Sequence, residues 1–195
     1  MLVTLSKNFD EAEREFESAM RLDPKLFEAA YFYARARKTQ GRLADAAKLF
    51  ERAAAIRPED YQSPTSLAEV YAGMGMPAES MEARRRAAKV VENWLELNPD
   101  DARACVYGAV NLAALGDQEG AQALAARATA IDAEDPMLLY NITCMYARLG
   151  NHEEALKHLE SAVDKGYGHK DWMEHDSDLD PIRESPRFKA IVQAM

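Results

Sequence analysis

The sequence predicts an all-α fold: a stack of antiparallel helix pairs with a helical cap at the C-terminus. Two observations carry this prediction, a self-similarity with a period of 34 residues and glycines that recur at nearly the same interval. The composition agrees, because 48% of the 195 residues are hydrophobic and only nine are glycine and eight proline. Such a period is typical of helix pairs that bury their apolar sides against their neighbours.

The clearest unit of the repeat is LADAAKLFERAAAIRP, residues 43–58. Its Ala-Phe-Ala-Pro series occurs twice, 34 residues apart: first as Ala12, Phe16, Ala19 and Pro24, then as Ala46, Phe50, Ala53 and Pro58. The turns inside successive helix pairs are marked by glycines with separations of 34, 41 and 34 residues: Gly41, Gly75, Gly116 and Gly150. Small residues at repeated positions allow two helices to approach closely, and large residues fill the space between them.

This pattern resembles the tetratricopeptide repeat (TPR) family over residues 1 to about 167, and residues 27–60 are the best copy. The resemblance implies a right-handed superhelix of antiparallel helix pairs. It divides the chain into a partial first repeat, four further repeats and a capping segment: 1–26, 27–60, 61–101, 102–135, 136–167 and 168–195. Departures from the family pattern, such as Arg37 at an aromatic position and Arg84 and Ala125 at a large-residue position, weaken single repeats only.

The first repeat lacks most of its first helix, and its second helix is predicted at about residues 8–22. Part of the apolar stripe of that helix is therefore expected to be exposed: Phe9, Ala12, Phe16 and Ala19. Terminal repeats normally carry a polar outer face or a cap. Two explanations stay open, that the chain is a piece of a longer protein or that two copies pair at this end.

The second helix of the third repeat is predicted to be seven residues too long. Pro99 follows Ala87 by twelve residues, whereas five separate Ala53 from Pro58. Seven residues are two helical turns, about 10 Å, so the extension continues the same apolar side of the helix. The apolar stripe of the extension includes Trp94, which either forms a docking surface or, in the plainer interpretation, packs against the next repeat.

Residues 168–195 do not continue the repeat. They predict a short helix near residues 169–175, a turn through Asp180–Pro181, and a final helix capped by Ser185–Pro186. Their apolar residues are expected to cover the fifth repeat: Trp172, Leu179, Ile182, Phe188, Ile191, Val192 and Met195. The segment resembles the tail of TPR arrays in bacterial multidomain signalling proteins with a nucleotide cyclase, Ser/Thr kinase or winged-helix domain. That resemblance is compatible with the chain being the C-terminal part of such a protein.

Charge and composition exclude several classes of function. A net charge of −9, with the whole acidic surplus in residues 61–195, argues against binding to a phosphate backbone, which requires clustered lysine and arginine. The chain has no apolar run near the roughly 20 residues of a membrane span, and its first residues do not resemble a signal peptide. Cys105 and Cys144 fall in different predicted helices and are expected to be buried, reduced thiols of a cytoplasmic protein.

No catalytic motif is present, so we expect no enzyme and no cofactor. The acids and histidines of the tail suggest a metal site, since Asp176-Ser-Asp178-Leu-Asp180 imitates the start of an EF-hand loop. However, Pro181 and Arg187 stand where that loop requires glycine and an acid. Turn-forming and helix-capping roles explain the aspartates better, and a bound metal is not expected.

The TPR resemblance implies a concave groove lined by the first helix of each pair. The residues at its lining positions are Tyr31, Arg35, Lys38, Thr65, Glu69, Arg103, Tyr107, Tyr140, Asn141 and Arg148. The expected function is non-catalytic binding of a protein, peptide or partner helix, with Trp94 as a secondary contact. The first alternative is a homodimerisation module, and the second is a metal-dependent enzyme built on the tail. Some of the tyrosines are as well explained by packing between repeats.

Overall fold

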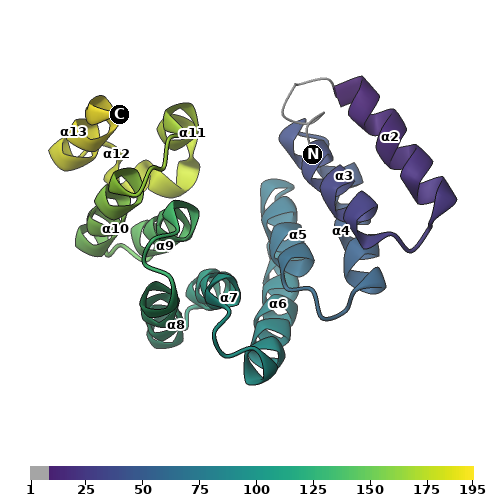
Figure 1. The fold of residues 1–195 in the computed structure, drawn as a ribbon, viewed down its shortest axis with the longest axis horizontal. Helices are drawn as coiled ribbons and strands as arrows, with labels where there is room; N and C mark the ends of the chain where they lie inside the picture. The colour runs from purple at the N-terminus through teal and green to yellow at the C-terminus, as the bar shows by residue number, and fades with distance from the viewer. Residues whose placement is uncertain (1–8) are drawn as a thin grey trace. The chain divides into compact units, whose positions relative to one another are not determined.

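A computed structural model describes residues 9–195, except for the side chains of Phe9, Asp10, Asp171, Trp172 and His175. Helices joined by short turns make up this part of the chain, and no strand occurs in it (Figure 1). The chain divides into two compact units, residues 1–90 and 91–195, and the boundary falls inside one helix.

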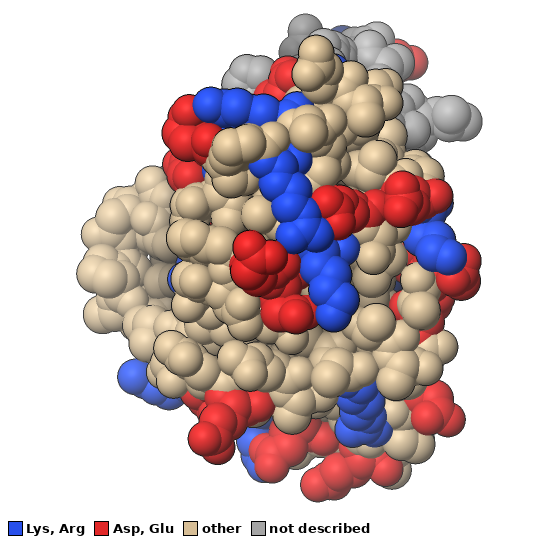
Figure 2. All heavy atoms as spheres, turned by 90° about the vertical axis from the view of Figure 1, so that its left-hand side faces the viewer, with Lys and Arg blue, Asp and Glu red and all other residues tan. Residues whose placement is uncertain are grey.

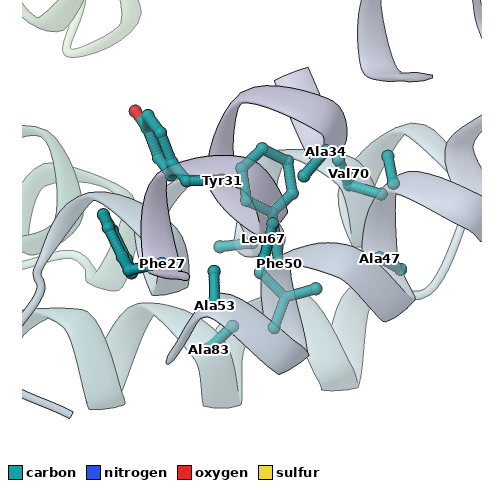
Figure 3. Close-up of a cluster of buried hydrophobic side chains, with 12 residues drawn as sticks. Phe27, Tyr31, Ala34, Ala47, Phe50, Ala53, Leu67, Val70 and Ala83 are labelled. Atoms are coloured by element: carbon teal, nitrogen blue, oxygen red, sulfur yellow. The ribbon is translucent and has the colours of Figure 1, made fainter. Parts of the chain in front are cut away.

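The first unit contains α2 (Phe9–Leu22), α3 (Phe27–Thr39), α4 (Leu43–Ile56), α5 (Gln62–Gly73) and the start of α6 (Pro77–Leu97). Helix α3 packs against α2 and α4, and α4 packs against α5. The core of this unit is a cluster built around Phe50, which is completely buried and meets the ring of Tyr31 edge-on at 5.9 Å. Figure 3 shows Tyr31 at the edge of this cluster, with its hydroxyl oxygen directed away from the aliphatic side chains.

The repeated glycines end the first helix of each pair. Gly41 has φ 73° and Gly116 has φ 89°, a left-handed conformation that glycine adopts without a steric penalty. The Gly41 amide donates to the Lys38 carbonyl and the Arg42 amide donates to the Arg37 carbonyl. These bonds satisfy the last carbonyls of α3. Local backbone geometry therefore explains why a glycine recurs at the end of each first helix.

The second unit contains two complete helix pairs. They are α7 (Ala102–Leu115) with α8 (Gln118–Ile131), and α9 (Pro136–Arg148) with α10 (His152–Asp164). The two helices of each pair pack against each other, and α7 also packs against α9. Side-chain oxygens cap all four helices at their N-termini, through Asp101, Asp117, Asp135 and Asn151. Such caps satisfy amides that have no partner within the helix.

Helix α6 has 21 residues, whereas α4 has 14. In the added turns, Val91 and Leu95 are buried. A Cβ atom added to Gly108 of α7 would lie only 2.9 Å from Cγ1 of Val91, so the two helices are in close contact there. Trp94 is half-buried, and its indole Nε1 donates a hydrogen bond of 2.9 Å to Asp101. Part of the apolar stripe of the extension is thus buried inside the second unit, whereas Leu97 at the end of the helix is exposed.

The closing segment comprises α11 (Lys170–His175), the 3-10 helix η1 (Ser177–Leu179), α12 (Asp180–Arg183) and α13 (Pro186–Ala194). Helix α9 packs against η1 and α12, while α10 packs against α12 and α13. The apolar residues buried in this segment are Met173, Leu179, Ile182, Phe188, Ile191 and Val192. Met195 is exposed, and the side chain of Trp172 lies outside the described residues.

Helix α2 lies against α3 through both apolar and charged contacts. Ala12 is buried, and the half-buried ring of Phe16 stacks on Tyr33 with centroids 5.5 Å apart. The Arg37 guanidinium is buried, and it donates to Glu13 of α2 and to the Tyr33 hydroxyl. Arg37, which departs from the family pattern, thus has a partner on the neighbouring helix.

Lowering the pH below about 4.5 is expected to loosen α2 from α3. The hydrogen bond from Arg37 holds the pKa of the Glu13 carboxyl below its ordinary value of 4.5. A group whose pKa is lowered by folding stabilises the folded state above its ordinary pKa, and this contribution is lost as the pH falls through the lowered value. We expect a loss of roughly 0.5–1 kcal/mol, because the carboxyl is partly exposed.

Amide hydrogen exchange of residues 11–22, corrected for the intrinsic effect of pH, measures this loosening. The variant Glu13→Gln cannot titrate and is expected to show no comparable pH dependence. An equal loss of protection in this variant and the wild type would contradict the prediction.

Candidate partner-binding groove

The predicted groove residues all lie on the first helices of the pairs, α3, α5, α7 and α9, and they differ widely in exposure. Arg35, Arg103 and Arg148 are exposed, and Lys38, Glu69, Tyr107 and Asn141 are half-buried. Tyr31, Thr65 and Tyr140 are buried. The exposed and half-buried residues are accessible to a partner, whereas the buried ones support the face from below.

In the first unit, two polar contacts join α3 to α5. The Tyr31 hydroxyl donates to Oε1 of Gln62 at 3.1 Å, and Lys38 pairs with Glu69. The Thr65 hydroxyl donates to the carbonyl of Tyr61, the residue that precedes α5, and Thr65 is buried. These contacts join the two first helices, and Arg35 of α3 is exposed.

Arg35 is the unpaired cation of α3. Its guanidinium carbon lies 5.8 Å from the ring centroid of Tyr31 and 5.9 Å from that of Phe32. It forms no ion pair with any residue that the structure describes. The sequence pointed to Arg35 and Tyr31 but missed Phe32, because the apolar residues of α3 cannot be divided between core and surface by periodicity alone.

In the second unit, the accessible residues of α7 and α9 are more mixed in character. Arg103 is exposed and has no ion pair among the described residues. Met137, which stands at the second position of its repeat, is 46% exposed and was not predicted as a groove residue. Together with Tyr107 and Asn141, these side chains provide a cation, an aromatic ring, an amide and an apolar thioether.

The closing segment contacts the other groove residues of α9. The Tyr140 hydroxyl donates to Oδ2 of Asp176 at 2.7 Å, and Nη1 of Arg148 lies 3.3 Å from Oδ1 of Asp178. The ring of Tyr140 also stacks on Tyr167, with centroids 4.2 Å apart and planes within 7°. Tyr140 is thus enclosed by its own chain, which favours the packing interpretation for this tyrosine.

These contacts have little trace in the sequence. The acidic run 176–180 is expected to cap helices and form turns, and Asp176 does accept the Asp178 amide in that way at 3.0 Å. Its second role, as the acceptor for Tyr140, joins residues 36 positions apart. A run of aspartates carries no signal for such a distant partner.

Buried groups near this contact are held in their neutral forms. Burial raises the pKa of the Tyr140 hydroxyl and raises the pKa of the Cys144 thiol well above its ordinary value. Burial likewise raises the pKa of the Cys105 thiol. Reactive cysteines require a lowered pKa and some exposure, so neither thiol is set up as a nucleophile.

Within the part of the chain that the structure describes, no three histidine, cysteine, aspartate or glutamate side chains are grouped so as to hold a metal ion. The side chains of Asp171 and His175, which belong to the acidic and histidine-rich tail, lie outside that part. His158 Nδ1 bonds with the Glu154 carbonyl at 2.8 Å, and His169 meets the ring of Tyr167 edge-on. These contacts are structural in character, and neither involves a serine or cysteine.

Charges on the face that carries the C-terminal helices are mixed. Figure 2 shows lysine and arginine side chains beside aspartate and glutamate side chains, with broad uncharged areas between them. Arg187 of α13 pairs with Glu160 at 2.5 Å and with Glu153 at 3.1 Å. On this face the lysine and arginine side chains form a band that is flanked by aspartate and glutamate side chains. None of the helices in residues 9–195 combines the length and apolarity that crossing a membrane requires.

Comparison with known proteins identifies the architecture. Residues 4–63 match the family model described as tetratricopeptide repeat. A solved TPR protein of Thermus thermophilus superposes with a TM-score of 0.66 at 23% identity, over 87% of this chain and 89% of that one. The chain has a tetratricopeptide-repeat fold. This confirms the all-α fold predicted from the sequence.

Other TPR structures agree. PilW, a type IV pilus biogenesis factor, gives a TM-score of 0.62 at 18% identity, over 98% of this chain and 86% of its own. YrrB, described as a TPR protein with an unusual peptide-binding site, gives 0.50 at 24% identity, over 86% of this chain and 83% of its own. Residues 110–195 also match a model described as the N-terminal domain of A/B hydrolase-like proteins. No curated protein sequence matches the chain.

Proposed function

We propose that this TPR chain is a non-catalytic interaction module that binds a peptide or a partner helix along the exposed faces of its first helices. The observation that carries the proposal is the pair of exposed arginines, Arg35 and Arg103, which form no ion pair among the described residues. Each stands at a groove position of a first helix, and Arg35 lies beside the rings of Tyr31 and Phe32. YrrB, a structural neighbour, is described as having a peptide-binding site.

These side chains suit recognition of a partner better than they suit stabilisation of the fold. Arginine, tyrosine and methionine are enriched in interfaces, where flat or flexible apolar surface is combined with hydrogen-bonding groups. An exposed arginine without a carboxylate partner adds little to folding stability. The same guanidinium binds a partner's carboxylate or carbonyl through well-directed hydrogen bonds.

The non-catalytic part of the proposal rests on the absence of hydrolase motifs in the sequence and on the raised pKa values of both cysteine thiols. The match to an A/B hydrolase-like N-terminal domain covers only helical residues and turns of the described chain, from within α7 to the end of α13. We also propose that the protein is cytoplasmic and bacterial and that it is part of a larger signalling protein. The resemblance of residues 168–195 to the tail of TPR arrays in bacterial signalling proteins supports this extension. The reading frame in the DNA upstream of the codon for Met1 tests whether the chain belongs to a larger signalling protein.

We do not extend the proposal to a homodimer through the long α6 helix. Its apolar residues Val91 and Leu95 are buried in the chain's own second unit. The two most exposed large apolar side chains among the described residues, Leu22 and Leu97, are each the last residue of a helix. Isolated exposed leucines are common on protein surfaces and do not indicate an interface.

Selection from a display library of random peptides tests the proposal. Peptides enriched on the purified protein are expected to bind the variant Arg35→Ala or Arg103→Ala about tenfold more weakly than the wild type, since a charge-assisted hydrogen bond is lost. Fluorescence anisotropy with the labelled peptides measures this change.

Lys48→Ala is the matched control, because Lys48 is an exposed cation on α4, a second helix. It is expected to leave the affinity unchanged. Failure to select any peptide, or peptides that bind all three variants equally well, would contradict binding at the first helices.

A further inference from the structure

We infer that the turn between α2 and α3, together with the adjacent side of α4, binds the surface of a membrane that contains anionic lipids. We name this surface, residues 21–25 with Lys48 and Arg52, the basic turn. It is separate from the candidate groove, which lies on the first helices. Its cations would meet the phosphate groups of the lipids, and the side chain of Leu22 would enter the boundary between head groups and acyl chains.

The apolar part of the basic turn is Leu22, the last residue of α2. Its side chain is 86% exposed, more than any other large apolar side chain that the structure describes. An exposed leucine by itself indicates no interface. This one, however, belongs to five consecutive exposed residues that begin with Arg21 and end with Lys25. An exposed apolar side chain among cations is typical of surfaces that lie in the membrane interface.

Helix α4 adds two further cations. Nη2 of Arg52 donates a hydrogen bond of 2.8 Å to the Pro24 carbonyl, so this side of α4 reaches the turn. Lys48 is exposed and stands four residues before Arg52, on the same side of the helix. No ion pair within the described chain engages any of the four cations, Arg21, Lys25, Lys48 and Arg52.

The acids near these cations do not cancel their charge. Asp23 is the one acid of the basic turn, and its Oδ1 accepts the Lys25 amide at 2.8 Å. The two acids of α4 have other partners, Asp45 with Arg42 and Glu51 with the Tyr71 hydroxyl. Four cations therefore stand against one acid. Each lysine or arginine close to an anionic membrane strengthens binding about fivefold.

The second unit contains a matching turn. Its residues 96–100, ELNPD, repeat the pattern of residues 21–25, RLDPK. Leu97 is likewise the last residue of a second helix and is 84% exposed. Arg127 donates to the Pro99 carbonyl, as the equivalent arginine does in the basic turn. The two turns thus share their local structure and their exposed leucine.

The two turns differ in charge. In the second unit, Glu96 and Asp100 stand in place of the two cations that flank the leucine. The difference extends to the whole units, since residues 1–90 hold 15 basic and 14 acidic side chains and residues 91–195 hold 9 and 19. Salt at about 0.1 M screens exposed charges beyond about 10 Å, so the charge close to the membrane decides binding. An anionic membrane therefore selects the turn of the first unit.

Co-sedimentation of the full-length protein with lipid vesicles tests the inference. The vesicles contain phosphatidylcholine alone, or phosphatidylcholine with about 30% phosphatidylglycerol as the anionic lipid. At about 0.05 M NaCl we expect the protein to bind the anionic vesicles about tenfold more strongly than the neutral ones, and at about 0.5 M NaCl to be released. Equal binding to the two kinds of vesicle would contradict the inference.

Protein variants locate the contact. The double variant Lys25→Glu, Lys48→Glu is expected to lower the partition coefficient about twentyfold or more. Leu22→Ser is expected to lower it about fivefold, because apolar contact with the lipid is lost. Leu97→Ser is the matched control and is expected to bind like the wild type. Circular dichroism confirms that each variant is folded. Unchanged binding of the double variant, or equal losses in the two serine variants, would overturn the inference.

A second copy of the chain is the other occupant to be tested. Its acidic turn at residues 96–100 carries the opposite charge. Sedimentation velocity without vesicles would then show self-association that the Lys25→Glu, Lys48→Glu variant abolishes, and this result would replace the membrane by a second copy. The proposed function fails or stands separately, because the peptide affinities of Arg35→Ala and Arg103→Ala are measured without lipid.

Discussion

Replacing Phe50 with alanine is expected to lower the free energy of unfolding of the first unit by about 3–5 kcal/mol. Phe50 has no exposed surface, and its ring lies at the centre of the cluster in Figure 3, next to Ala53 and Leu67. The truncation removes apolar area and leaves a cavity that α3, α4 and α5 fill only in part, because their backbones are held by the turns between them.

Urea unfolding combined with hydrogen exchange, followed separately for residues 9–90 and 91–195, measures this effect. Separate measurement is needed because two compact units do not guarantee a single two-state transition. Leu22→Ala is the control in the same unit, since Leu22 is 86% exposed, and it is expected to change stability by about 0.5 kcal/mol or less. A comparable loss in both variants would show that Phe50 is not the centre of the core.

The Phe50 variant also affects the candidate groove. The ring of Tyr31 rests edge-on against Phe50, and the guanidinium of Arg35 lies beside Tyr31. We therefore expect Phe50→Ala to weaken binding of the display-selected peptides indirectly. Its signature is a loss that disappears under conditions that keep the unit folded, such as low temperature, whereas the loss in Arg35→Ala persists.

Replacing Leu179 with alanine is expected to destabilise the second unit by about 2–5 kcal/mol. Leu179 is completely buried at the end of η1, which packs against α9. It anchors the stretch that carries Asp176 and Asp178. Its truncation leaves a cavity between the closing segment and the last helix pair, so the contacts to Tyr140 and Arg148 are expected to loosen as well.

Hydrogen exchange of α9 amides and the reactivity of Cys144 toward a thiol reagent measure this loosening, because the thiol is buried in the folded state. Lys189→Ala is the control, as Lys189 is an exposed residue of α13 that pairs with Glu184 at the surface. It is expected to leave both readouts unchanged. Unaltered protection of α9 in Leu179→Ala would show that the segment does not seal the second unit.

The candidate site was only partly predictable from the sequence. The groove positions carried over from the TPR resemblance include Arg35 and Arg103, which are exposed, but also Thr65 and Tyr140, which are buried. A repeat position states which side of a helix a residue lies on. It does not state how closely the next segment covers that side, and on α9 the cover comes from the irregular residues 176–178.

The sequence by itself determined the helix pairs and their turns, because these depend on local chemistry. Gly41 and Gly116 end helices through a backbone conformation that favours glycine, and Asp101 and Ser185 begin helices by accepting amide hydrogen bonds within three residues. Only the tertiary structure decided the partners of the charged and aromatic groups. Glu13 with Arg37, and Asp176 with Tyr140, meet across 24 and 36 residues, and Arg35 stays unpaired because no carboxylate of the described chain reaches it. Such pairings depend on how distant segments pack, and sequence spacing carries no information about that.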